Sequence, residues 1–121
     1  MNIAAALLLP FALLQAEPLA GSGDARLQAC VAMIDADPER AYEEGMAWSA
    51  LTEEIGGFRC AAMALIAQGR AEEGARRLEG MAAALSPDAA ALRAELLSQA
   101  GNAWMIERDA AHARSAFSRA V

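Results

Sequence analysis

The sequence contains no lysine, and its ten basic side chains are all arginines. Sixteen acidic residues give a formal net charge of −6, and no basic run is present. Nucleic-acid binding needs a basic patch that neutralises phosphates, so a nucleic-acid partner is not expected. Aromatic residues are also few, at 5% against 56% hydrophobic residues, because alanine makes up much of the apolar content. No segment alternates with a strand's period of two, so we predict an all-α fold.

Residues that could carry chemistry are scarce as well. His112 is the only histidine, and without a second histidine or a cysteine beside it no zinc site is predicted. The sequence has no nucleophile elbow, phosphate-binding loop or metal-ligand spacing. Trp48 and Trp104 are expected to pack in the core rather than to form ligand platforms. We therefore predict no catalytic, cofactor-binding or metal-binding residue and do not expect an enzyme.

The N-terminus has the pattern of a processing signal. Residues 3–14 are uncharged and almost wholly apolar, a length typical of a signal-peptide core and too short for a membrane span. Ala16 offers a cleavage site, which gives a signal peptide over 1–16, a flexible linker over 17–23 and a periplasmic or secreted protein. Met1 and Asn2 supply no positive side chain, and the alternative is an apolar helix that packs on the domain.

Capping and turn residues divide the rest of the chain into six helices. Asp24 is expected to cap a helix that ends near Asp35, and Asp37-Pro38 to start one that ends near Thr52. Gly56-Gly57 should separate this helix from the next one. The next helices are expected over 58–68 and 71–84, with Gly69 in the turn between them. Ser86-Pro87-Asp88 should cap a helix that ends near 106, and the last helix should span 110–120.

Two parts of the chain repeat one spacing of large and small residues. The clearest repeat is Leu97, Ala100, Gly101 and Trp104, followed by Ala113 and Phe117. The second is Phe58, Ala61, Ala62 and Leu65, followed by Gly74 and Leu78. In both, large residues should fill the space between helices and small ones should let two helices approach closely. A first copy is weaker: Ala41 fits the small position, but Gly45 stands where a large residue is expected.

This spacing resembles the tetratricopeptide repeat, whose pattern is W-x2-L-G-x2-Y followed by A-x3-F. The resemblance covers residues 24–121 and implies a helical-hairpin solenoid of about three repeats. Ala41, Gly74 and Ala113 then occupy equivalent positions, 33 residues (41 to 74) and 39 residues (74 to 113) apart, against a family period of about 34. The longer interval predicts extra residues around 86–91. The alternative is an alanine-rich bundle whose periodicity is accidental.

The resemblance places Cys30 and Cys60 in the first helices of adjacent hairpins, which lie side by side. In an exported protein this favours a disulfide between them. The alternative is a pair of buried thiols that act as small apolar residues.

The same resemblance implies a protein-interaction module, because the first helices of such hairpins line a concave groove that holds a peptide or protein. The groove residues that it implies are Arg59, Met63, Ile66, Glu95, Ser98, Asn102 and Met105. Arg59 and Asn102 resemble the basic and amide residues with which some family members hold a peptide carboxylate, although here the basic residue stands alone. The alternative function is a repeat segment or subunit of a larger envelope enzyme whose catalytic part lies elsewhere.

The last helix carries an apolar stripe, formed by Ala113, Ala116, Phe117 and Ala120. Solenoids usually finish with a more polar capping helix. We therefore expect either further repeats beyond Val121 or self-association through this helix.

Overall fold

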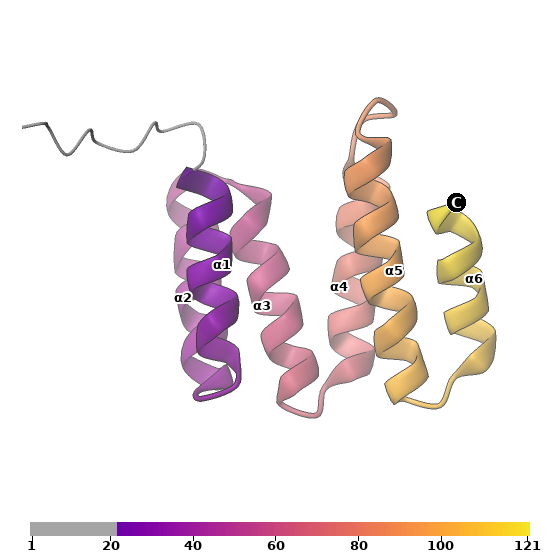
Figure 1. Ribbon diagram of the computed structural model, residues 1–121, viewed down its shortest axis with the longest axis horizontal. Helices are drawn as coiled ribbons and strands as arrows, with labels where there is room; N and C mark the ends of the chain where they lie inside the picture. Colours follow the sequence, from indigo (N-terminus) through magenta and orange to yellow (C-terminus); the bar gives the residue numbers. More distant parts are fainter. Residues whose placement is uncertain (1–21) are drawn as a thin grey trace, which may run out of the picture.

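A computed structural model describes residues 22–121, and this part of the chain is helical with no strand. The helices are α1 (Ser22–Ile34), α2 (Pro38–Thr52), α3 (Ile55–Ala67), α4 (Ala71–Ala84), α5 (Ala90–Ile106) and α6 (Ala110–Ala120). They run alternately up and down, and each packs against the next (Figure 1). The predicted all-α fold is confirmed. The proposed signal peptide and most of the linker lie outside the described residues. No helix within 22–121 has the length and apolar content needed to cross a bilayer.

Three-residue turns join α1 to α2, α3 to α4 and α5 to α6. The second and third turns have the same geometry, because Gly69 and Arg108 both adopt positive φ, at 83° and 60°. In both turns the residue before the next helix, Arg70 or Asp109, donates its N–H to a carbonyl five residues back at 2.9 Å. Asp37 and Asp109 then cap α2 and α6 by accepting hydrogen bonds from backbone N–H groups. The chain therefore turns in the same way after α3 and after α5.

The register of α2, α4 and α6 is shared too. Ala41, Gly74 and Ala113 are each the fourth residue of their helix, and all three are buried. The extra residues before Ala113 lie partly where we expected them. Five residues (85–89) separate α4 from α5, against two (53–54) between α2 and α3, and α5 has 17 residues against 13 in α3.

One predicted boundary is wrong. Gly56 and Gly57 do not break the chain but lie in the first turn of α3. The break falls two residues earlier, where Glu53 adopts positive φ (59°) and Glu54 is extended. Glu54 is held there because its carboxylate accepts from Trp48 Nε1 at 2.9 Å and its carbonyl accepts from the Ser49 hydroxyl at 2.8 Å. Tertiary contacts of α2 therefore set this boundary.

The expected start of α5 is also wrong. α5 begins at Ala90, and Ser86-Pro87-Asp88 form a separate turn. The Ser86 carbonyl accepts from the Ala89 N–H at 3.0 Å, and the Ser86 hydroxyl bonds the Asp88 side chain and lowers its pKa. Arg93 closes the turn from α5 by donating to the carbonyls of Leu85 and Ser86. Ser86 is engaged within the turn and does not cap the helix. At the other end, α1 begins at Ser22, two residues before the expected cap.

The buried residues form two clusters that meet at α3. The first joins α1, α2 and α3 around Cys30, Ile34, Ala41, Cys60 and Ala64. The second joins α3 to α4, α5 and α6, with Leu78, Leu96, Leu97 and Trp104 as its large members. Cys30 and Cys60 form the expected disulfide, with 6.1 Å between their Cα atoms, and it ties α1 to α3.

The residues expected to pack between helices do so unevenly. Leu78, Trp104 and Trp48 are buried, whereas Phe58 is 39% exposed and does not fill the space expected of it. The small residues Gly74 and Gly101 lie at close approaches. A Cβ on Gly74 would fall 2.7 Å from the Ala62 carbonyl of α3, and one on Gly101 would fall 2.5 Å from the Phe117 ring of α6.

Candidate peptide-binding groove

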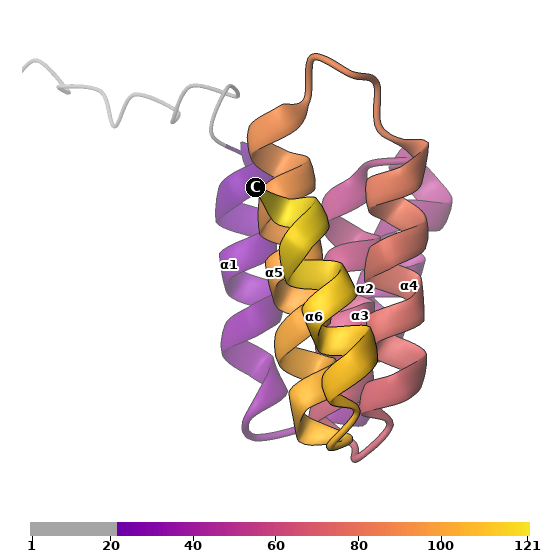
Figure 2. The same ribbon diagram turned by 90° about the vertical axis from the view of Figure 1, so that its right-hand side faces the viewer.

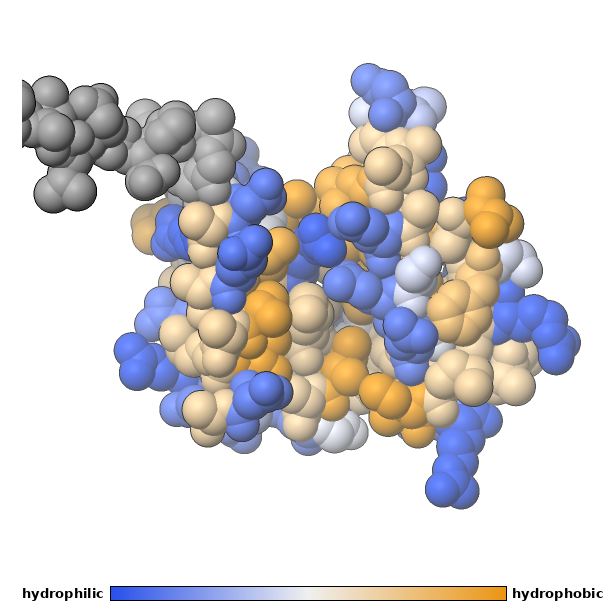
Figure 3. Space-filling model, viewed as in Figure 1, coloured by the Kyte–Doolittle hydropathy of each residue, from blue (hydrophilic) through white to orange (hydrophobic). Residues whose placement is uncertain are grey.

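The structure brings three of the seven expected groove residues together. Arg59 of α3 and Glu95 and Ser98 of α5 line one hollow of about 500 Å³. On the face where α1 and α5 lie in front of α2 and α4, hydrophilic side chains gather between α1 and α5 (Figure 3). Helices α3 and α5 therefore provide the two walls of the candidate groove.

The other four residues lie elsewhere or at its edge. Ile66 packs against the second cluster beside Gly74, and Met63 packs against the first cluster. Asn102 is exposed and does not line the hollow. Met105 lines a different hollow, between α5 and α6.

Arg59 is the central side chain of the groove. Its side chain is only 14% exposed, and Nη2 contacts Glu95 Oε2 at 3.4 Å, where Glu95 is 63% exposed. Its Nε–H is buried and has no hydrogen-bond partner within residues 22–121. A buried donor without a partner is unusual and costs free energy, more so on a charged group. Arg59, which lines the hollow, therefore keeps one buried N–H without a partner.

Gln99 is the functional candidate that the sequence reasoning missed. It lines the same hollow, its Nε2 lies 3.9 Å from Met63 Sδ, and its buried Oε1 has no partner in the described part of the chain. The groove amide is thus Gln99 rather than Asn102. Helical spacing could have identified it, because Glu95 and Gln99 are four residues apart and share a face.

A second hollow of about 320 Å³ adjoins the first at Arg59. Its apolar wall is made by Leu27 of α1, Ile55 of α3 and Leu92 of α5, and Asp24 and Glu54 stand among its other lining residues. Arg59 lines both hollows, of which one has this apolar wall and the other carries the polar side chains of Glu95, Ser98 and Gln99. This combination suits a ligand with an apolar side chain next to a polar main-chain group.

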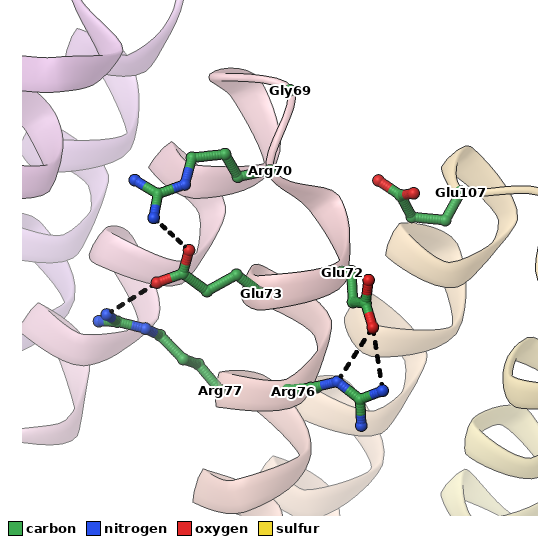
Figure 4. A pocket seen from close by; sticks show the side chains of 7 residues that line it. All are labelled: Gly69, Arg70, Glu72, Glu73, Arg76, Arg77 and Glu107. Atoms are coloured by element: carbon green, nitrogen blue, oxygen red, sulfur yellow. Dashed lines mark hydrogen bonds and ion pairs between the residues drawn. The ribbon is translucent and has the colours of Figure 1, made fainter.

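Another hollow, of about 610 Å³, lies on α4 and the end of α5 and is lined mainly by charged side chains (Figure 4). Glu72 pairs with Arg76 at 3.0 Å, and Glu73 pairs with both Arg70 and Arg77. These are exposed or half-exposed pairs three or four residues apart on one helix, which contribute a few tenths of a kcal/mol each. Arg76 and Arg77 therefore belong to an ion-pair face of α4.

Histidine and tryptophan have structural roles. His112 is exposed, stacks on Trp104 at 4.4 Å and lies 2.7 Å from Asp109 Oδ2. The backbone N–H of His112 donates to Asp109 and lowers the pKa of that carboxyl. Trp104 Nε1 donates to Glu79 of α4. Within 22–121 no three histidine, cysteine, aspartate or glutamate side chains are grouped to hold a metal ion.

No protein-family model matches this chain, and no curated protein or solved structure matches it significantly. Its function has therefore to be inferred from the sequence and the geometry of these surfaces.

Proposed function

We propose that the protein is a helical-hairpin solenoid, similar to tetratricopeptide repeats, that binds a peptide or protein segment in the groove between α3 and α5. The shared turns and register of the helix pairs support the repeat. The observation that carries the function is the Arg59 guanidinium, whose buried Nε–H lacks a partner at the edge of two hollows.

The ligand chemistry follows from the unused polar atoms. Both atoms are buried, so once each side chain turns toward the hollow a carbonyl or carboxylate oxygen would satisfy Arg59 and an N–H would satisfy Gln99 Oε1. A peptide main chain offers both groups, and a neighbouring apolar side chain would occupy the hollow beside Leu27, Ile55 and Leu92. The Arg59–Glu95 pair does not oppose this, because Glu95 is largely exposed and such pairs are weak.

Replacing Arg59 with alanine is expected to weaken peptide binding by about 10- to 100-fold, since hydrogen bonds to a charged group contribute about 1.5–3 kcal/mol. Peptides selected on the wild-type protein from a random library would be titrated by calorimetry against Arg59→Ala. Arg40→Ala is the matched control, because Arg40 is an exposed arginine on α2 with only a 3.9 Å pair to Glu44. Equal affinity in Arg59→Ala and the wild type, with the fold intact by circular dichroism, would exclude this groove.

We also propose that the protein is exported and acts in the periplasm or outside the cell. The apolar run over residues 3–14 and the Cys30–Cys60 bridge support this, since disulfides persist in oxidising compartments. N-terminal sequencing of protein from its native host should find a start at or near Glu17. Recovery of protein that begins at Met1 from the cytosol would contradict export.

The exposed side of α6 supports a separate proposal, self-association through the C-terminal helix. Met105 is 57% exposed and Phe117 36%, and both line a hollow of about 450 Å³ with Arg114 and Ser118. Viewed from this end, α6 is the nearest helix, and none of the described helices covers it (Figure 2).

A further inference from the structure

The uncovered side of α6 corresponds to a side of α2 that α4 contacts. Because α2 begins at Pro38 and α6 at Ala110, Arg114 and Ser118 occupy the register positions of Tyr42 and Met46. Both of those residues are in contact with Arg77 of α4, which donates to Tyr42 Oη at 3.2 Å and lies 3.7 Å from Met46 Sδ. The surface that another helix pair covers on α2 is therefore the surface left open on α6.

The distribution of charge along the chain indicates which surface would bind α6. Residues 110–121 contain two arginines and no acidic side chain, whereas residues 22–54 contain eight acidic side chains and two arginines. Nearly all of the chain's net charge of −6 thus lies at the end opposite α6. Arg114 is exposed and has no ion-pair partner among the described residues.

The register also supplies the partner residue. Arg77 stands at the seventh position of α4, and the seventh position of α2 is Glu44. Suppose that α1 and α2 of a second copy pack on α6 as α3 and α4 pack on α2. Glu44 of the second copy then corresponds to Arg77, and Arg114 corresponds to Tyr42, so Glu44 contacts Arg114. Glu44 is 55% exposed, and its one ion pair is the long contact to Arg40.

We propose that α6 of one molecule binds the acidic α1–α2 hairpin of a second copy, head to tail, with Arg114 paired to Glu44. This inference rests on the self-association proposed above and is independent of the Arg59 groove. A heterologous contact of this kind uses different surfaces on the two molecules, so it extends into open chains or closes into a ring.

Reciprocal charge reversal tests the pairing by sedimentation velocity on the purified protein at concentrations up to about 1 mM. Arg114→Glu and Glu44→Arg should each weaken association tenfold or more, because each places like charges in the contact. An equimolar mixture of the two should regain the wild-type association, since every contact between unlike molecules then joins opposite charges. Glu43→Arg, the same charge change one residue away, should associate like the wild type.

The outcomes separate the two proposals. Wild-type protein that stays monomeric throughout would overturn self-association and the head-to-tail pairing together. Association that persists in both variants, or mixtures that do not recover, would overturn the pairing alone and leave a symmetric α6 contact. Circular dichroism of each variant checks that the helices are retained.

Discussion

Replacing both cysteines with alanine is expected to lower the free energy of unfolding by about 3–4 kcal/mol, the chain-entropy estimate for a bridge that closes a loop of this size. The bridge joins residues 30 apart in the sequence and ties α1 to α3. Helix α1 depends on it more than the other helices do, because the cluster that holds α1 is small and most of its members are alanine or cysteine. The loss should therefore be greatest at α1.

Two measurements check this expectation. Urea denaturation of Cys30→Ala/Cys60→Ala should give a lower midpoint, and hydrogen exchange should show loss of protection in α1 before α4 and α5. The wild-type protein treated with a thiol reductant is the control, because reduction breaks the disulfide without substituting any amino acid. An unchanged midpoint in both samples would mean that packing alone holds α1.

Substituting Gly57 with alanine is expected to destabilise the protein by about 2–3 kcal/mol, towards the upper end of the usual cost of overpacking. Gly57 of α3 and Gly45 of α2 are both buried where these helices cross. A Cβ on Gly57 would collide with the Gly45 carbonyl and fall 2.8 Å from the Ser49 backbone nitrogen. Backbone atoms cannot move aside as a side chain can, so α2 and α3 would have to separate.

Gly80→Ala is the matched control, with the opposite sign. Gly80 lies inside α4, and a Cβ there would meet nothing within 4 Å. Alanine should stabilise this helix by about 0.5–1 kcal/mol, because it loses less conformational entropy than glycine. Thermal unfolding followed by circular dichroism would compare the two variants. A Gly57→Ala melting temperature equal to the wild-type value would show that the crossing is looser than described.

Local signals were sufficient for much of the fold. Pro38 and Asp37 predicted the start of α2, and Gly69 predicted the turn before α4, because these residues act through their own backbone geometry. The end of α2 at Thr52 agrees with expectation, but the start of α3 at Ile55 could not be predicted in the same way. Gly56 and Gly57 are usually helix breakers, but here they are needed inside α3 so that α2 can approach. Such a requirement exists only once the two helices are packed.

The candidate groove was predictable to a similar degree. Repeat register placed Arg59, Glu95 and Ser98 on facing helices, and the structure brings them to one hollow. The apolar hollow beside Arg59 was not predictable, because Leu27 and Leu92 come from helices 65 residues apart (27 to 92) and meet only through the stacking of three hairpins. The missing partner of Arg59 Nε likewise depends on side-chain packing.

The Cys30–Cys60 bridge also determines how the chain would respond to mechanical force. When a folded domain is pulled from its two ends, the extension gained on unfolding reports the length of chain released. The segment between the bridged residues, with α2 inside it, cannot lengthen while the bridge is intact. At about 3.3–3.6 Å per residue this hides roughly 100 Å of contour length. Tension along the oxidised chain therefore bypasses α2 and is carried from α1 directly into α3.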